Sequence, residues 1–320
     1  MKRRIFFTYF SITRPLSNLC KNFFNVSTLP PGDFALSNPM RLLYNGSVIL
    51  QKKEGRFFMA YKLIALDLDD TLLDCEKHIS KRNREALAAA RAKGAHIVLA
   101  SGRAYAGVSG FNEALGNRDY TIVCGGGQVA DPDGKVIYSA YLSPITTKQV
   151  MRWAVTHGAY FQVYTDEGYF FLQRNDYSDY YEKLCGYSGI EDPDLMNKEM
   201  ILAAKILLID TEEKLEEYRS ELSAMFPELV IKKSQSDFLE IMDPTATKGN
   251  ALEYLAKKLG IERQQVMAVG DSEIDESMLE WAGLGIAMEN ACSACKEAAN
   301  DVTASCNEDG VALAIEKYII

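Results

Sequence analysis

The 320-residue chain has only three histidines, at positions 78, 96 and 157, which argues against a site built from several histidine ligands. It lacks an apolar run long enough to span a bilayer. Its seven cysteines are an odd number scattered along the chain, which suits a reducing compartment better than a secreted disulfide framework. The net charge of −9 argues against a broad contact with nucleic acid or an anionic membrane. Carboxylates are therefore the first place to look for chemistry.

Residues 1–58 differ from the rest of the chain in charge and in pattern. They carry nine basic residues against two acidic ones, and they show no sustained helical or alternating period. We assign no fold to this extension and expect it to be disordered or to precede the native start. An Arg-rich, acid-poor start is typical of an organellar transit peptide. We favour the alternative of upstream sequence before a start at Met59, because KKEG at 52–55 can be encoded by purine-rich codons like a bacterial ribosome-binding site.

From Tyr61 onward, short apolar runs alternate with amphipathic stretches, which is the pattern of βαβ units around a parallel sheet. The predicted core strands are 63–66, 96–100, 121–124, 266–269 and 285–288. A helix is expected to begin after Ser80 as its N-cap and to end near Gly94. Residues 129–138 predict a hairpin that turns at 131–134.

The middle of the chain, residues 143–246, has a different composition, because aromatic residues crowd into 160–164 and 169–171. After them, the pattern predicts a strand at 205–209, a helix at 212–225 and strands at 229–233 and 238–242. We interpret this part as a self-contained α/β unit inserted into a core formed by 59–142 and 247–320. The predicted fold class is α/β, with a parallel-sheet core and a second, inserted domain.

The sharpest motif is DLDDTLLD at 67–74, directly after the predicted strand at 63–66. The carboxyl ends of parallel strands form the rim at which open α/β sheets bind ligands. Asp67 and Asp69 are two residues apart, so they share one face or straddle the first turn of a loop. Because nearby carboxylates repel each other unless a cation or a shared proton intervenes, the pair suits a divalent metal. An acidic loop that caps the next element explains the same spacing.

Three later features also follow a predicted strand or begin a predicted helix. In chain order they are Ser101-Gly102-Arg103, Lys248, and Gly270-Asp271 with Asp275 nearby. They offer a hydroxyl and a free backbone amide, a positive charge, and further carboxylates. Each alone has an ordinary explanation: Ser101 as a cap, Lys248 as a surface charge and Asp271 as an N-cap. Chance explains a single such placement more easily than all three together. The shared placement therefore favours a ligand-binding site.

In these residues the sequence resembles the haloacid dehalogenase (HAD) superfamily and, within it, the Cof-type phosphatases. The resemblance covers about residues 59–320 and rests on four motifs: DLDDT at 67–71, LASGR at 99–103, Lys248 within ATKGNAL, and GDSEID at 270–275. It implies a Rossmann-like core with an α/β cap between the second and third motifs. It also implies Mg²⁺-dependent hydrolysis of small phosphorylated metabolites, such as sugar phosphates or phosphorylated cofactors.

Carried onto this sequence, the resemblance implies a nucleophile and an acid/base residue. Asp67 would attack phosphorus and form an aspartyl-phosphate, and Asp69 would protonate the leaving alcohol and then activate water. Ser101, Gly102 and Lys248 would hold the transferring phosphoryl group. An Asp at position 69 favours hydrolysis over a long-lived phosphoenzyme.

The resemblance also implies a Mg²⁺ site formed by Asp67, the main-chain carbonyl of Asp69, and Asp271. Asp275 would orient Lys248 or a metal-bound water, and Thr71 would support the same site from behind. Phosphoryl transfer depends on charge neutralisation and in-line positioning, which is what such a site provides.

The chain departs from the family pattern at Gly125, Ile274 and Cys306, where an asparagine is common in or near the motifs. We expect activity that is weaker or shifted in substrate preference. Further candidates for substrate contact are Gly125, Gly126, Ser234, Asp237, Glu240 and one or two of Tyr164, Tyr169 and Tyr187. The CSAC sequence at 292–295 has disulfide-oxidoreductase spacing, but we interpret it as ordinary buried thiols because no second pair accompanies it.

Two other functions fit the same motifs. A non-catalytic module that binds a phosphorylated metabolite would explain the three departures, although it would not need Asp69. A phosphoryl-transferring mutase would need a bisphosphate activator. We expect a cytoplasmic monomer or homodimer whose partner is a small phosphorylated metabolite, with no nucleic acid and no membrane.

Overall fold

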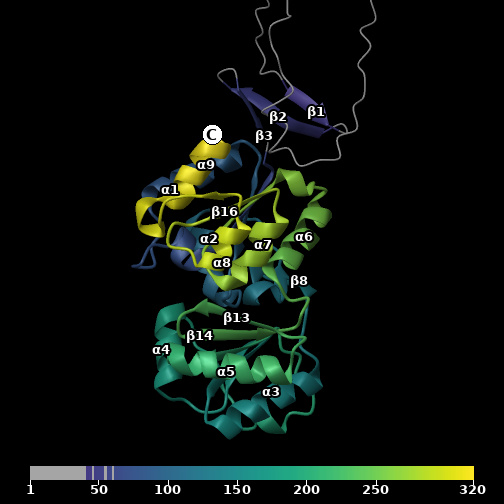
Figure 1. Ribbon diagram of the computed structural model, residues 1–320, viewed down its shortest axis with the longest axis vertical. Coiled ribbons are helices and arrows are strands. Elements are labelled where there is room, and N and C mark those ends of the chain that lie inside the picture. Colours follow the sequence, from purple (N-terminus) through teal and green to yellow (C-terminus); the bar gives the residue numbers. More distant parts are fainter. Residues whose placement is uncertain (1–40, 45–46, 54–55, 60) are drawn as a thin grey trace, which may run out of the picture. The chain divides into compact units, whose positions relative to one another are not determined.

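The computed structural model describes residues 41–44, 47–53, 56–59 and 61–320 (Figure 1). Strands β1 (Arg41–Tyr44), β2 (Ser47–Lys53) and β3 (Arg56–Met59) pair in sequence order as a small antiparallel sheet. We assigned no fold to residues 1–58, and these three strands are structure that the sequence pattern did not indicate. Their apolar residues come in unbroken runs, which show no period of two. Whether the extension is disordered elsewhere or precedes the native start stays a prediction. The expected transit peptide or false start concerns mostly residues outside the described part.

The larger sheet has eight strands in the order β17-β16-β15-β4-β5-β6-β7-β8. Their bounds are β4 Leu63–Leu66, β5 His96–Ala100, β6 Thr121–Val123, β7 Gln128–Ala130, β8 Val136–Ser139, β15 Val266–Gly270, β16 Leu284–Ala287 and β17 Asp301–Val302. The strands from β17 to β6 are parallel, whereas β7 and β8 form the predicted antiparallel hairpin. The predicted α/β fold with a parallel core sheet is therefore confirmed.

Strand β4 lies at the point where the strand order reverses, because β5 and β6 follow on one side and β15 and β16 lie on the other. All four of its residues are fully buried, as expected for a strand covered on both faces. In open α/β sheets, ligands bind at the carboxyl ends of the strands beside such a reversal. The residues that follow β4, β5 and β15 therefore meet at one rim.

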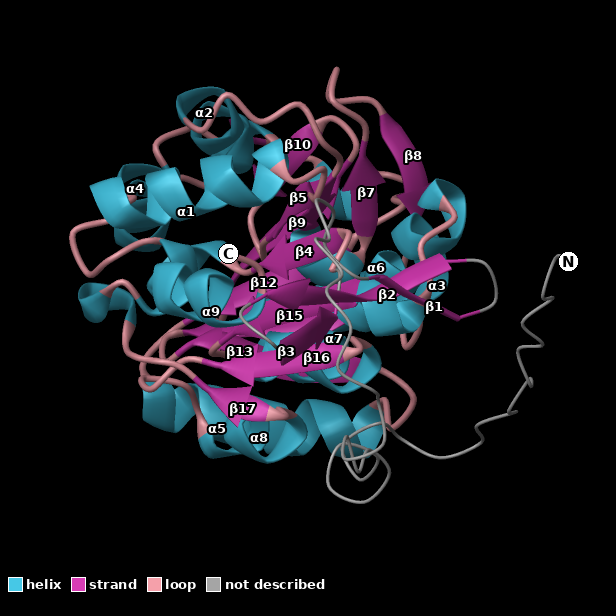
Figure 2. Cartoon of the chain, turned by 90° about the horizontal axis from the view of Figure 1, so that it is seen from above, coloured by secondary structure: helices cyan, strands magenta, loops and turns pink. Residues whose placement is uncertain are grey.

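Helices cover both faces of this sheet (Figure 2). Their bounds are α1 Lys81–Ala92, α2 Ala106–Ala114, α6 Lys248–Leu259, α7 Glu276–Trp281, α8 Ser293–Ala298 and α9 Gly310–Tyr318. Helix α1 packs beside α9, and α6 packs beside α7. As predicted, α1 is capped by Ser80, whose Oγ accepts a hydrogen bond from the Asn83 amide at 3.0 Å. None of the described helices is both long and apolar enough to cross a bilayer.

A second sheet of six strands lies between residues 160 and 242, in the order β11-β10-β9-β12-β14-β13. Its strands are β9 Tyr160–Thr165, β10 Gly168–Phe171, β11 Ile190–Glu191, β12 Lys205–Ile209, β13 Val230–Gln235 and β14 Phe238–Met242. Its helices are α3 Pro144–His157, α4 Asp176–Cys185 and α5 Glu212–Met225 (Figure 1). We call residues 143–246 the cap. The bounds 59–142, 143–246 and 247–320 stay predictions.

The cap sheet buries both of its faces. Residues Phe161 and Val163 of β9 pack in an apolar cluster with α3 and α5. The alternate residues Tyr160 and Tyr164 point to the other face, where Tyr164 lies opposite Lys205 of β12. That second face carries polar groups as well as aromatic rings, and it is the face that reaches the candidate site.

Candidate active site

The first part of the site is the loop after β4. Asp67 continues the strand, since its amide donates to the Val269 carbonyl at 2.9 Å. The next turn, Leu68–Leu72, buries both of its leucines and breaks helical geometry at Asp69 and Asp70, where φ of Asp70 is +56°. The buried leucines anchor the loop, so Asp67 and Asp69 lie at the rim of the sheet. Their side chains point to different partners.

Lys248 is fully buried at the start of α6 and binds two carboxylates. Its Nζ lies 2.5 Å from Oδ1 of Asp67 and 2.5 Å from Oδ1 of Asp275. Burial alone would lower the pKa of Lys248, but the charges of Asp275 and Asp67 outweigh it and raise the pKa. Lys248 is therefore not a surface charge. It links the third motif to the first and the fourth.

Three carboxylates gather beside Lys248, because oxygens of Asp67, Asp271 and Asp275 lie within 4.8 Å of one another. Burial, followed by the charge of Asp275, raises the pKa of Asp67 to about 7. Burial, followed by the charge of Asp67, raises the pKa of Asp271 well above its usual range. Thr71 Oγ1 donates to Asp271 at 2.6 Å. Such crowding of negative charge is relieved by a divalent cation with oxygen ligands.

Asp275 is already occupied by protein partners. Its Oδ1 binds Lys248, and its Oδ2 accepts hydrogen bonds from the amides of Asp271 and Ser272 at 3.1 and 2.9 Å and from the Ser272 hydroxyl at 2.9 Å. This leaves Asp67 and Asp271 as the carboxylates best able to hold a cation. The arrangement fits a positioning role for Asp275, which is the role that the resemblance implies.

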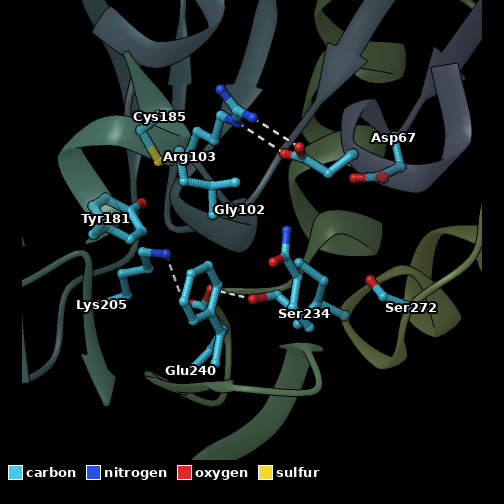
Figure 3. Close-up of a pocket in the computed structure, with 14 residues that line it drawn as sticks. Asp67, Gly102, Arg103, Tyr181, Cys185, Lys205, Ser234, Glu240 and Ser272 are labelled. Carbon is cyan, nitrogen blue, oxygen red and sulfur yellow. Dashed lines mark hydrogen bonds and ion pairs between the residues drawn. The ribbon is translucent and has the colours of Figure 1, made fainter. Parts of the chain in front are cut away.

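Asp69 is held by Arg103 through two parallel hydrogen bonds (Figure 3). Lys77 adds a third contact, with Nζ 3.2 Å from Oδ1 of Asp69. Burial acts to raise the pKa of Asp69, but the hydrogen bonds and charge of Arg103 outweigh it, so the pKa lies below its usual range. In this arrangement Asp69 is an ionised carboxylate.

A cavity lies between the rim of the core sheet and the cap. Its lining residues are Asp67, Asp69, Gly102, Arg103, Tyr181, Leu184, Cys185, Lys205, Ser234, Gln235, Phe238, Glu240, Ser272 and Ile274. The volume of the cavity is about 30 Å³. That is room for roughly two waters, whereas small-molecule sites usually measure about 300 Å³ or more. In this structure the cavity is therefore too small to hold a small-molecule ligand.

The structure brings most of the predicted residues together. Asp67, Asp69, Gly102 and Ser234 line the cavity, and Lys248, Asp271, Asp275 and Thr71 lie directly behind it. Ser101 is buried in the turn after β5, where its Oγ accepts a hydrogen bond from the Arg103 amide at 3.1 Å. The catalytic, phosphate-binding and metal roles of these residues stay predictions.

Gly125 and Gly126 are not among the cavity-lining residues that the structure describes. A Cβ on Gly126 would lie 2.2 Å from the carbonyl carbon of Thr247, so a glycine lets this turn pass against the start of α6. At Gly125 a Cβ would lie 2.7 Å from Sδ of Met242, which fills the space beside that glycine. In this structure both glycines allow close packing of the turn against its neighbours, and neither lines the cavity.

Other candidates also lie away from the cavity. Among the described residues, Tyr164, Tyr169, Tyr187 and Asp237 are not in its lining, whereas Glu240 is. Cys292 and Cys295 are free thiols, and the buried Cys295 donates to the Ser272 carbonyl at 2.8 Å. Cys295 is buried as expected, whereas Cys292 is partly exposed, and the interpretation of the pair as ordinary thiols stays a prediction.

The sequence analysis missed the pairing of Arg103 with Asp69. It also missed six cap residues in the lining: Tyr181, Leu184, Cys185, Lys205, Gln235 and Phe238. One signal was available for Lys205. It begins the strand KILLI, whose four remaining residues are all apolar and buried. A lysine buried among them needs a partner of opposite charge. No local pattern distinguishes Tyr181 from its neighbouring tyrosines.

The chain belongs to the haloacid dehalogenase-like hydrolase family, whose model matches residues 64–315. A protein of Streptococcus pyogenes serotype M6 is 34% identical over 275 residues, which cover 82% of this chain and 100% of its own length. The 5-amino-6-(5-phospho-D-ribitylamino)uracil phosphatase YcsE of Bacillus subtilis is 32% identical over 261 residues, covering 81% and 96%. A haloacid dehalogenase-like hydrolase from Bacteroides thetaiotaomicron has a TM-score of 0.71 at 31% identity, covering 80% and 99%. The expected superfamily and the expectation of a hydrolytic enzyme are confirmed.

Proposed function

We propose that this chain is a Mg²⁺-dependent phosphatase of the Cof type that hydrolyses small phosphorylated metabolites through an aspartyl-phosphate. The observation that carries the proposal is the contact of buried Lys248 with Asp67, beside a cluster of carboxylates at the rim of a parallel sheet. A buried ammonium held beside the attacking carboxylate is placed to donate a hydrogen bond to a phosphoryl oxygen in a site that excludes water. Sugar phosphates and phosphorylated cofactors are the substrates we favour.

In the first step, a carboxylate oxygen of Asp67 attacks phosphorus and the bond from phosphorus to the ester oxygen breaks. The leaving alkoxide takes a proton from Asp69. In the second step, Asp69 removes a proton from water, the water oxygen attacks phosphorus, and the bond to Asp67 breaks to release inorganic phosphate. Lys248 and the amides of the turn after β5 hold the phosphoryl oxygens throughout.

Mg²⁺ would be held by Asp67, the carbonyl of Asp69 and Asp271, and it would supply positive charge to the transferring phosphoryl group. Asp275 keeps Lys248 and the loop around Asp271 in place. Before the first step, Asp69 must leave Arg103 and gain a proton, because its present partners keep it ionised. We expect Asp69 to leave Arg103 and to gain its proton when the substrate binds and the cap moves.

The test is phosphate release from p-nitrophenyl phosphate and a panel of phosphorylated metabolites, with and without Mg²⁺, beside Asp67→Asn. Mg²⁺-dependent turnover that is lost in Asp67→Asn is the expected result. A folded, Mg²⁺-loaded protein that binds members of the panel without turnover would overturn the phosphatase and favour the binding module. Turnover only with a bisphosphate activator would favour the mutase. A cytoplasmic monomer or homodimer that binds no nucleic acid stays a prediction.

A further inference from the structure

The cap presents a buried ion pair to the cavity. Nζ of Lys205 on β12 lies 2.6 Å from Oε2 of Glu240 on β14, and the two side chains are only 1% and 2% exposed. Ser234 on β13 donates its hydroxyl to Oε1 of Glu240 at 2.7 Å. The Lys205 ammonium also lies 4.3 Å from the centre of the Tyr164 ring. Three adjacent strands thus hold a single polar cluster in a fixed geometry.

This cluster faces the catalytic rim. Lys205, Glu240 and Ser234 line the same cavity as Asp67 and Asp69. Figure 3 shows the three cap residues across the cavity from Asp67. A Cβ added to Gly102 would lie 3.3 Å from Oε1 of Glu240, so the cap carboxylate closes against the turn that follows β5. In an in-line attack by Asp67 the leaving group would depart on the side away from Asp67, which is the side that Lys205 and Glu240 line.

A buried ion pair seldom stabilises a fold more than apolar residues of similar size would, because removing both charges from water is costly. On the same strands and the same face, Leu207 and Phe238 are apolar and buried. The position of Lys205 and Glu240 at the cavity wall favours a role in binding over a role in stability.

The charges of the pair cancel, and this decides which leaving group it suits. A hydroxyl can donate to the Glu240 carboxylate and accept from the Lys205 ammonium, so a chain of hydroxyls satisfies both. A carboxylate or a second phosphate would find Lys205 already neutralised and Glu240 repelling it. Burying such an anion here would leave its charge uncompensated.

We propose that the pair of Lys205 and Glu240 selects phosphate monoesters whose leaving group is an uncharged polyol, and that it rejects leaving groups with a second negative charge. This inference rests on the proposed phosphatase function and adds the substrate class and the residues that choose it. Lys205 and Glu240 act as specificity-determining residues, whereas the phosphoryl group is handled by the core.

The test compares two six-carbon compounds that differ only at the far end of the chain, sorbitol 6-phosphate and 6-phosphogluconate. The wild-type kcat/KM is expected to be about tenfold or more higher for the uncharged compound. Glu240→Gln leaves Lys205 unneutralised, so the ratio should shift toward 6-phosphogluconate by about tenfold or more. Lys205→Met should shift the ratio in the other direction, because Glu240 then stands alone. A merely structural pair would lower both activities equally.

A matched control exists in the cap. Lys198 lies 2.6 Å from Asp192 and 4.7 Å from the centre of the Phe170 ring, so it has the same kinds of contact at a more exposed position outside the cavity lining. Asp192→Asn should leave the substrate ratio unchanged. If Glu240→Gln does not fold, the double variant Lys205→Met/Glu240→Gln removes both charges. The double variant should still prefer the uncharged compound, but with a higher KM for that compound.

Hydrolysis of p-nitrophenyl phosphate separates this inference from the function on which it rests. If Mg²⁺-dependent p-nitrophenyl phosphate turnover is absent, the proposed function fails. The selection inference fails if that turnover is present but the wild type prefers 6-phosphogluconate, hydrolyses neither compound, or shows a ratio that no variant at Lys205 or Glu240 alters.

Discussion

Arg103 holds both carboxylate oxygens of Asp69, with Nε 2.8 Å from Oδ2 and Nη2 2.7 Å from Oδ1. Arg103 is 6% exposed, so this is a largely desolvated, two-point pair rather than a surface contact. The residue proposed to donate a proton is thus kept ionised by its own neighbour. Arg103 sets the acidity of Asp69 and, by the same contact, its orientation.

Arg103→Lys should move the pH dependence of turnover. A lysine cannot make both hydrogen bonds, so the pKa of Asp69 should rise from its lowered value toward the usual one. Since the first step needs protonated Asp69, the alkaline limb of the kcat/KM profile should shift to higher pH. The measurement is p-nitrophenyl phosphate hydrolysis across pH, and an unshifted limb would contradict this role for Arg103.

The metal-free protein should lose stability as pH rises from about 4 to about 7. In that window the folded Asp67, with its pKa raised to about 7, keeps a proton that the unfolded chain has released. Folding is therefore favoured at the low end and disfavoured at the high end, and Asp271 contributes with the same sign. Thermal melts over this range should show a decline that is smaller in Asp67→Asn.

Mg²⁺ should oppose that decline, because it binds the folded carboxylates in their ionised form. At a Mg²⁺ concentration one hundred times its dissociation constant, the free energy of unfolding should rise by about 2.7 kcal/mol. The gain in melting temperature at pH 8 should be large in the wild type and small in Asp271→Asn. Equal gains in both proteins would place the cation elsewhere.

Lys248→Met should destabilise the fold as well as abolish turnover. It would leave Asp67 and Asp275 buried without their shared cation, which costs about 3–5 kcal/mol when one partner of a buried pair is removed. Urea unfolding measures this cost. Lys257→Met is the control on the same helix, because Lys257 contacts Glu253 at the surface, where such pairs contribute about 1 kcal/mol or less. Similar losses in the two variants would contradict the central position of Lys248.

Gly126→Ala should displace the start of α6. Its φ is +100°, and the new Cβ would lie 2.4 Å from the amide nitrogen of Lys248. We expect a loss of about 1–3 kcal/mol in unfolding free energy together with a lower kcat. Gly110→Ala is the matched control, since nothing lies within 4 Å of the added atom inside α2 and a helix gains about 0.5–1 kcal/mol from alanine. An unaltered kcat in Gly126→Ala would show that the contact does not position Lys248.

The sequence predicted the residues at strand ends far better than their partners. Asp67, Lys248 and Asp271 could be placed at one rim because parallel strands align their carboxyl ends, whatever their distance along the chain. The pair of Lys205 and Glu240 could not be found that way. It depends on β12 lying beside β14 in one register, which local periodicity does not specify.

The surroundings of Gly125 could not be predicted from the sequence either. The departure at Gly125 suggested a lost substrate contact, yet the space beside it is filled by Met242 from the cap. Whether a missing side chain leaves a gap depends on what packs there from a distant segment. The strands at 41–59 illustrate a different difficulty, because pairing of the backbone produced a sheet from runs that lack alternation.

The position of β4 in the core sheet also constrains how the protein is made. One neighbour, β5, leaves the ribosome soon after it, but the other neighbour, β15, begins at Val266 and follows the whole cap. The cap can complete its six-stranded sheet while one edge of β4 still has open backbone groups. An unpaired apolar edge of this kind attracts other chains, so the stage between synthesis of the cap and arrival of β15 is when the nascent protein is most exposed to aggregation.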